Sequence, residues 1–407
     1  MTLHLSSPEN ATLEGDIMLP GSKSESNRAL ILQAISKGLI QVEGISEAKD
    51  SQILQQLLRE HPETMDVGHA GTAMRFLTAY LAFRPEDKLL TGSARMQERP
   101  IGPLVNALRT MGAEIAYLGE KGYPPLLIFG RNAKFGESEV VLPGNVSSQF
   151  VSALLLIAYQ QPDGLRIRLV GEVLSRPYIE MTLELLSRFG IQHTWEGDTI
   201  HVPKQQLRSG TFKVEADWSA ASYWFCVTAL AKSAKINLHG LRRESLQGDS
   251  VVAAKMADLG VQTNWQKDIL QLTGHGPIRQ NIHWDFSDCP DLAQGMIVAA
   301  AALGAKPTFT GLQSLRIKET DRIAALQTEL AKFGIQLMEE NNRWWLEGQF
   351  VSKENVISTY QDHRMAMAFA PLALCTPSIS IAEANVVEKS YPSFWTDLQK
   401  VGLAVSA

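Results

Sequence analysis

The chain has 407 residues, of which 45% are apolar and 20% are charged. This length predicts two domains, and the composition is that of a globular enzyme, which excludes disordered, fibrous and disulfide-stapled proteins. The 38 Lys and Arg residues are outnumbered by 43 Asp and Glu residues, so the surface offers no general field for nucleic acid. Three scattered cysteines, no leader-like N-terminus and no apolar run of membrane-spanning length favour a cytoplasmic protein without nucleic-acid or membrane partners.

The first motif is a tight turn over residues 20–28 that feeds the apolar run over 29–34. Free backbone N–H groups at a helix start favour an anion, and Lys23, Ser24 and Arg28 would add charge and hydrogen bonds to a phosphate-sized site. The spacing of a Walker loop is absent, so ATP is not indicated. The alternative is a capped helix with a solvated Lys23 and Arg28.

Two more helix starts carry polar side chains. Residues 68–75 include Gly71, where a ligand could approach the backbone closely, and residues 145–149 include Ser147, Ser148 and Gln149. Helix capping explains one hydroxyl at a helix start, but it does not explain the Arg or Gln beside that hydroxyl. We therefore interpret all three helix starts as candidate anion sites, with simple capping as the alternative.

A helix followed by a glycine and a hairpin recurs along the chain. The glycines, 68 to 78 residues apart, are Gly112, Gly190, Gly260, Gly334 and Gly402. A Gly directly after a periodic apolar helix predicts a left-handed C-terminal cap, and turn signals over 191–198 and 335–342 predict hairpins. This spacing allows about six units. The first is truncated, because the candidate helix over 51–59 leaves too few residues before Gly68 for a hairpin.

Six units in two domains suggest three units in each domain. We place one domain at residues 20–214 and the second at residues 1–19 plus 215–407.

Two charged stretches precede helices in the second half. Residues 315–322 alternate in charge, which a solvated surface ladder would also explain, and residues 360–367 set polar groups before an apolar helix. His363 has no second His at i+3 or i+4, so no metal site is expected, and a buried structural histidine is the alternative. We interpret Cys226, Cys289 and Cys375 as packing residues.

Together these motifs resemble the 5-enolpyruvylshikimate-3-phosphate (EPSP) synthase family, almost end to end. The resemblance also covers residues 95–102, 122–125, 175–179, 290–291 and 388–392. It implies an α/β (α+β) fold of two enolpyruvyl transferase-like domains, each of three βαβαββ units, with the active site in the cleft between them. It also implies transfer of the enolpyruvyl group of phosphoenolpyruvate to the 5-hydroxyl of shikimate 3-phosphate, with release of phosphate, in aromatic amino acid biosynthesis.

The resemblance assigns residues to both substrates. Those implied for shikimate 3-phosphate are Lys23, Ser24, Arg28, Ser147, Ser148, Gln149, Ser175, Tyr178, Asp291, Ser314 and Lys318. Those implied for phosphoenolpyruvate are Lys23, Gly71, Arg99, Gln149, Arg322, His363, Arg364 and Lys389. The catalytic set is Asp291 as the base, with Glu319 and Lys23 nearest to the other proton transfers.

The resemblance implies no cofactor and no metal, and we expect a cytoplasmic monomer. It also implies inhibition by glyphosate, for which Gly71 would leave room. Ser314 stands where the family often has Asn, and Glu25 replaces an apolar residue. The alternatives are the sister transferase acting on UDP-N-acetylglucosamine, whose loop Cys is missing between Gly102 and Asn145, and a catalytically inactive binding paralogue.

Overall fold

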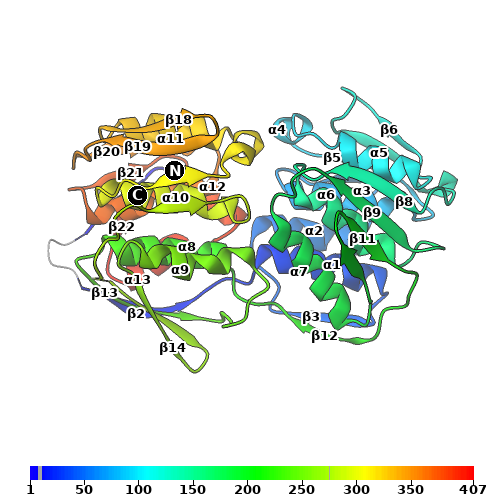
Figure 1. The fold of residues 1–407 in the computed structure, drawn as a ribbon, viewed down its shortest axis with the longest axis horizontal. Helices are drawn as coiled ribbons and strands as arrows, with labels where there is room; N and C mark the ends of the chain where they lie inside the picture. The colour runs from blue at the N-terminus through cyan, green and yellow to red at the C-terminus, as the bar shows by residue number, and fades with distance from the viewer. Residues whose placement is uncertain (8–11, 275) are drawn as a thin grey trace. The chain divides into compact units, whose positions relative to one another are not determined.

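The computed structural model describes residues 1–7, 12–274 and 276–407, which form two compact units (Figure 1). We call Ser22–Val214 the inserted unit, and Met1–Gly21 with Glu215–Ala407 the terminal unit. Each has its own hydrophobic core. In the described part of the chain, no helix combines the length and apolar character needed to cross a membrane. The expected cleft between the domains stays a prediction.

The inserted unit alternates helices and short strands. Its helices are α1 (Lys23–Ile35), α2 (Lys49–Glu60), α3 (Gly71–Ala82), α4 (Ala94–Gln97), α5 (Gly102–Thr110), η1 (Gly130–Asn132), α6 (Ser148–Ala158) and α7 (Arg176–Arg188). Its strands are β3 (Ile40–Glu43), β4 (Thr64–Asp66), β5 (Asp87–Thr91), β6 (Ile115–Tyr117), β7 (Leu126–Phe129), β8 (Glu139–Pro143), β9 (Leu165–Val170), β10 (Thr194–Glu196), β11 (Thr199–Val202) and β12 (Gly210–Lys213).

The terminal unit combines strands from both ends of the chain. Its helices are α8 (Trp218–Leu230), η2 (Gly248–Val251), α9 (Val252–Ala257), η3 (Pro290–Leu292), α10 (Ala293–Ala302), η4 (Gln313–Ile317), α11 (Arg322–Ala331), α12 (His363–Phe369), η5 (Ala370–Leu374), η6 (Ala384–Lys389) and α13 (Phe394–Lys400). Its strands are β1 (Leu3–Ser6), β2 (Thr12–Met18), β13 (Ser233–His239), β14 (Gln262–Gln266), β15 (Ile269–Thr273), β16 (His283–Asp285), β17 (Thr308–Thr310), β18 (Ile335–Glu340), β19 (Arg343–Gly348), β20 (Asn355–Ile357), β21 (Ile379–Ile381) and β22 (Ala404–Ser406).

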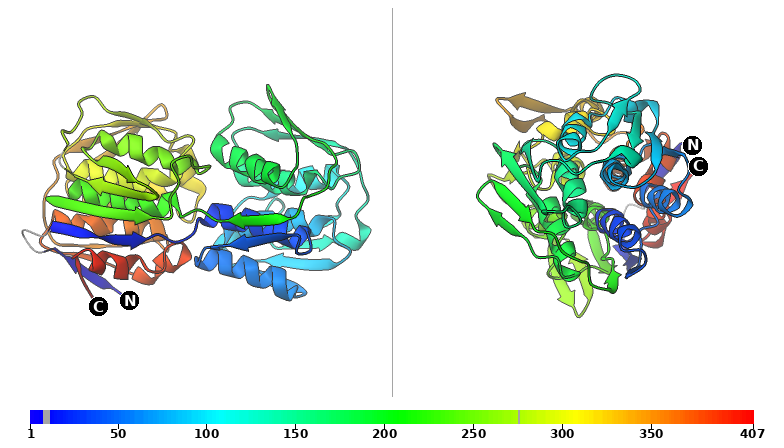
Figure 2. Two further views of the ribbon diagram at one scale, coloured as in Figure 1. Left: turned by 90° about the horizontal axis from the view of Figure 1, so that it is seen from below. Right: turned by 90° about the vertical axis from the view of Figure 1, so that its right-hand side faces the viewer.

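Five four-stranded sheets share one topology. Their orders are β4-β5-β7-β6, β10-β11-β9-β8, β14-β15-β13-β2, β16-β17-β19-β18 and β20-β21-β1-β22. In each, two parallel strands are followed by an antiparallel pair, as Figure 2 shows for β2 beside β13, so the βαβαββ unit is confirmed. The sixth sheet has only the parallel pair β12-β3, which confirms the truncated first unit.

The glycines that close the repeated helices have the predicted backbone conformation. Gly112, Gly190, Gly260, Gly334 and Gly402 all have positive φ, from 77° to 108°. At Gly112 an added Cβ would also lie 1.7 Å from the Lys134 carbonyl oxygen, so no other residue fits there. These glycines end the helices, and all but Gly402 lead the chain into a hairpin. Gly402 leads into the single strand β22, which pairs with β1.

The central helices are buried almost all round, whereas the strands bury one face. Nearly every residue of α3 and α6 in the inserted unit, and of α8, α10 and α12 in the terminal unit, is buried. Strand β9 alternates buried and exposed residues. Apolar helix bodies thus form each core, and polar groups concentrate at their N-terminal turns.

Candidate active site

In the inserted unit, Arg28 on α1 is a buried guanidinium that ties three helices together. Its Nε donates to Thr182 Oγ1 on α7 (2.7 Å), and its Nη2 donates to Ser152 Oγ on α6 (3.1 Å). Its Nη1 donates to the Ser24 carbonyl oxygen (2.8 Å), and burial lowers the pKa of Arg28 to about 10. Arg28 therefore holds α1, α6 and α7 together, and a direct contact with substrate stays a prediction.

Lys23 lies in the first turn of α1 and is held by a carboxylate that the sequence reasoning missed. Its Nζ is 3.3 Å from Asp50 Oδ2, at the start of α2, and the Lys23 side chain is 17% exposed. The Ser22 hydroxyl caps α1 by accepting from the Glu25 N–H (3.4 Å). Asp50 could have been found, because an acidic residue in the first turn of a predicted helix is a recognised signal.

The other two predicted helix starts of this unit meet each other. Gln149 Nε2 donates to Thr72 Oγ1 at 3.2 Å, which joins the start of α6 to the start of α3. Ser147 caps α6 by accepting from the Gln149 N–H (3.4 Å), and Ser148 is buried behind it. Ser175 precedes α7 with a left-handed φ of 56°. The starts of α3 and α6, which are separate sequence motifs, thus form one polar cluster.

Gly71 lies against Arg99. A Cβ added to Gly71 would be 2.6 Å from Arg99 Nη1 and 3.0 Å from its Cζ. Gly71 therefore lets a guanidinium rest on the start of α3, and a methyl group would first meet Arg99 rather than open space.

In the terminal unit, Arg322 is the centre of a buried ion network. Its Nε is 2.7 Å from Asp362 Oδ2, its Nη1 is 3.1 Å from Asp291 Oδ1, and its Nη2 is 2.8 Å from Glu319 Oε2. Its side chain is 2% exposed. The solvated ladder considered for residues 315–322 is therefore wrong for Arg322. Arg316 is exposed, but it pairs with Glu339 on β18, outside this stretch.

Two more predicted cations of this unit, Arg364 and Lys389, join the same network. Arg364 Nη2 is 2.7 Å from Asp291 Oδ2, and its Nη1 donates to the Tyr223 hydroxyl (3.3 Å). Lys389 Nζ is 2.9 Å from Glu319 Oε1. The structure thus brings three of the predicted phosphoenolpyruvate cations into contact with the predicted catalytic carboxylates Asp291 and Glu319.

These contacts set the protonation of the network. Burial alone would raise the pKa of Asp291, but Arg364, Lys318 and Arg322 together lower it well below its usual range. Asp291 is therefore ionised at neutral pH. Burial opposes the charge of Arg322, yet its pKa is raised because three carboxylates surround it, Asp362 most strongly.

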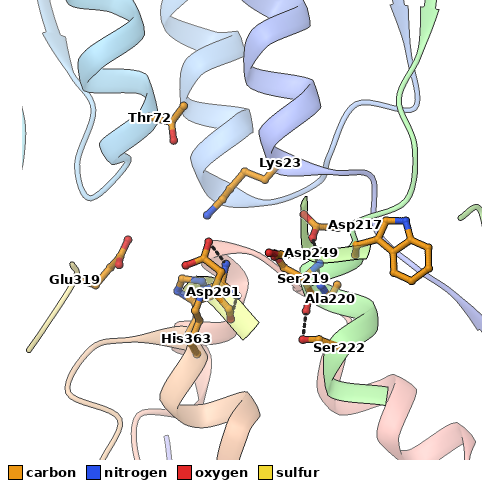
Figure 3. Close-up of polar contacts among 12 residues, drawn as sticks. Lys23, Thr72, Asp217, Ser219, Ala220, Ser222, Asp249, Asp291, Glu319 and His363 are labelled. Atoms are coloured by element: carbon orange, nitrogen blue, oxygen red, sulfur yellow. Dashed lines mark hydrogen bonds and ion pairs between the residues drawn. The ribbon is translucent and has the colours of Figure 1, made fainter. Parts of the chain in front are cut away.

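Asp249 and Asp362 are functional candidates that the sequence reasoning did not single out. Asp362 caps α12 by accepting from the Arg364 N–H (2.8 Å), a signal present in the sequence. Asp249 on η2 accepts from Ser219 on the first turn of α8 (Figure 3), and burial, with Asp291 nearby, raises its pKa to about 7. No local pattern marks Asp249.

The other predicted residues are half-buried or buried. Ser314, Lys318 and Tyr178 are half-buried, whereas His363 is 1% exposed, with its Nδ1 3.7 Å from Asp362 Oδ1. Within the described ranges, no group of three His, Cys, Asp or Glu is arranged to hold a metal ion.

The cysteines pack as predicted. Cys226 and Cys289 are buried and Cys375 is partly buried, and burial raises their pKa values to about 12, 12 and 11.

The repeated βαβαββ units and these cation-rich helix starts define an enolpyruvyl transferase. A family model described as EPSP synthase (3-phosphoshikimate 1-carboxyvinyltransferase) matches residues 54–398, and the chain belongs to this family. It is accordingly a transferase of the shikimate pathway of aromatic amino acid biosynthesis.

Individual proteins agree with the family match. The chain is 48% identical over 407 residues to 3-phosphoshikimate 1-carboxyvinyltransferase of Bacteroides fragilis (strain YCH46), covering 98% of each sequence. It is 34% identical over 422 residues to that of Tolumonas auensis, covering 96% of this chain and 97% of the relative. Its fold matches EPSP synthase from Acinetobacter baumannii with a TM-score of 0.78 over 100% of both chains, at 24% identity.

Proposed function

We propose that the charged network of the terminal unit and the polar helix starts of the inserted unit are the substrate-binding groups for enolpyruvyl transfer to shikimate 3-phosphate. The observation that carries this proposal is the pairing of the predicted cations Arg322, Arg364 and Lys389 with the predicted catalytic groups Asp291 and Glu319. A cluster of this kind suits an anionic substrate, which can replace the carboxylates on the cations.

Shikimate 3-phosphate is assigned to hydroxyls and helix starts. Ser147 and Ser24 lie at the N-terminal turns of α6 and α1, where free N–H groups favour a phosphate. Lys23 adds a positive charge that Asp50 holds in place. Ser175, Tyr178, Lys318 and Ser314 complete the assigned set.

Phosphoenolpyruvate is assigned to the guanidinium and ammonium groups. Its carboxylate and phosphate compete with Asp291 and Glu319 for Arg364, Arg322 and Lys389. Once Arg364 binds the substrate, it neutralises Asp291 less, and the pKa of Asp291 rises toward that of a useful base. Substrate binding thus prepares the base.

The chemistry is an addition followed by an elimination. Asp291 accepts the proton of the 5-hydroxyl while the oxygen bonds to C2 of phosphoenolpyruvate, and an acid group, Glu319 or Lys23, protonates C3. The tetrahedral ketal then loses a C3 proton to the same acid group, and the C2–O bond to phosphate breaks, releasing inorganic phosphate. Fixed Arg and Lys charges stabilise the anionic groups throughout.

The test is phosphate release by the purified chain with both substrates. We expect release only when shikimate 3-phosphate and phosphoenolpyruvate are both present, and none when UDP-N-acetylglucosamine replaces the first. No release from a folded chain that still binds shikimate 3-phosphate would favour the inactive paralogue instead.

We also propose that the chain acts as a cytoplasmic monomer. Its three cysteines are unpaired, as expected in a reducing compartment. Sedimentation at micromolar concentration should give the mass of a single 44.9 kDa chain, and twice that mass would contradict the proposal.

A further inference from the structure

The inserted unit carries a groove of about 310 Å³ that the proposed function does not use. It lies at the C-terminal end of α3, roughly 18 Å along this 12-residue helix from Gly71. The lining residues are Phe83, Arg84, Pro85, Gly130, Arg131, Ala133 and Phe135. This volume is at the lower end of small-molecule sites and suits a ligand with one ring.

Two aromatic rings form a flat wall of the groove. Phe83 and Phe135 stack with centroids 6.1 Å apart and an interplanar angle of 7°. Phe135 is 65% exposed, yet its loop is fixed, because the N–H groups of Lys134 and Gly136 bond to carbonyls at the end of α5 (3.1 and 2.9 Å). The backbone on both sides of Phe135 is therefore held in position, which keeps its ring beside the groove.

Arg84 is the one lining cation that no carboxylate of the described residues neutralises. Arg131 is 3.8 Å from Asp87, whereas no described acidic group lies within ion-pair distance of Arg84. The Arg84 guanidinium sits over the ring of Tyr80, 4.5 Å from its centroid. Its Nη2 is buried without a hydrogen-bond acceptor among the residues that the structure describes.

A second buried polar atom close to Arg84 is also unsatisfied. The Tyr159 hydroxyl has no hydrogen-bond partner in the described part of the chain. Burial raises the pKa of Tyr159, and the charge of Arg84 partly opposes this shift, so the two groups are close enough to interact. The unsatisfied Nη2 is costly inside the protein. Arg84 as a whole is only half-buried and lines the groove, so its positive charge is open to an anion bound there.

The C-terminal end of α3 has an electrostatic effect that opposes the binding of an anion. The last carbonyls of a helix carry about half a negative charge, which disfavours an anion, but the full charge of Arg84 at the same place is larger.

We propose that this groove binds a small aromatic monocarboxylate, with its ring against Phe83 and Phe135 and its carboxylate on Arg84. A single uncommitted cation favours one negative charge, and the flat wall favours a planar ring.

Benzoate titrated into the full chain, with shikimate 3-phosphate at saturation, tests this site by calorimetry. We expect Arg84→Gln to weaken benzoate binding at least tenfold, and the neutral benzamide to bind the wild type at least tenfold more weakly than benzoate. Phe135→Ala should also weaken benzoate severalfold. The control Arg59→Gln, on an exposed side chain paired with Glu60, should leave the affinity unchanged.

Three further measurements distinguish a lost ligand contact from a lost fold and from self-association. Arg84→Lys keeps the charge and should recover part of the affinity, whereas a fold defect in Arg84→Gln would appear as a lowered melting temperature. Equal benzoate affinity of Arg84→Gln and wild type would overturn the proposal. A dimer of the wild type that Phe135→Ala dissociates would also overturn it, because the groove would then hold a second copy.

Discussion

Arg28 in the inserted unit and Arg322 in the terminal unit are both buried guanidinium groups, but their partners differ. The acceptors of Arg28 are hydroxyls and carbonyls, and burial lowers its pKa to about 10. The acceptors of Arg322 are three carboxylates, which raise its pKa. An Arg held by neutral groups keeps its net charge for a substrate anion, whereas an Arg held by carboxylates presents little charge until a ligand displaces them.

The largest expected effect concerns a carboxylate of the Arg322 network. Asp291→Asn should lower kcat by about 10²–10⁴-fold, because it removes the base while keeping the shape of the side chain. The KM for phosphoenolpyruvate should stay equal or fall, since Arg364 loses a competing anion. Steady-state kinetics measure both constants, with the exposed Asp268→Asn as the control. Over half of wild-type kcat in Asp291→Asn would exclude this residue as the base.

The loss in free energy of unfolding should differ between substitutions of the two arginines. Arg322→Met leaves three carboxylates without their cation and should cost about 3–5 kcal/mol. Arg28→Met leaves neutral acceptors unpaired and should cost about 1–3 kcal/mol. Urea unfolding of both variants measures the difference, and a larger loss for Arg28→Met would contradict the comparison.

The pH dependence of the free energy of unfolding should reveal the titration of Asp249, which borders the Arg322 network. Its folded pKa, about 7, is above its unfolded value of 3.8. The stability that it contributes is therefore fully present below about pH 4 and is lost as the pH rises through 7. Asp291, Arg364, Ser219 and Asp217 face it.

Asp249→Asn should accordingly flatten the pH profile. Between pH 4.5 and 8, the unfolding free energy of wild type should fall relative to that of the variant, by on the order of 1–3 kcal/mol. Parallel profiles of the two proteins would show that the carboxyl of Asp249 is not protonated in the folded state.

The smallest expected effect concerns Gly71 and the neighbouring Arg99 in the inserted unit. Gly71→Ala should raise the KM for phosphoenolpyruvate and raise the inhibition constant of glyphosate more, by about tenfold or about 1.4 kcal/mol. The reason is that the methyl group pushes Arg99, whose Nη1 lies 2.6 Å from the added carbon. Gly119→Ala, at an exposed turn with room for a Cβ, is the matched control. Wild-type insensitivity to glyphosate would contradict the assignment of Gly71.

The fold was predictable because its signals are local and repeated. Each closing glycine marks its own helix end, and the short interval before Gly68 marks the truncated unit. The helix starts with Lys23 and Gln149 were found in the same way, since capping patterns span only a few residues.

The partners of these residues could not be predicted locally. Asp362 is 40 residues from Arg322, and Thr182 is 154 residues from Arg28. Such pairings depend on how helices pack, and a single sequence carries no short-range signal for them. The sequence reasoning therefore identified the cations of the site more completely than the groups that hold them.

The terminal unit is built from both ends of the chain, and this constrains the order in which the chain folds during synthesis. Strand β1 pairs with β21 and β22, and β2 pairs with β13, so the N-terminal strands lack their partners until much later residues have emerged from the ribosome. The inserted unit, in contrast, is complete once residue 214 is free. The middle of the chain can thus fold first, while β1 stays an unpaired, aggregation-prone edge until the final strand, Ala404–Ser406, is made.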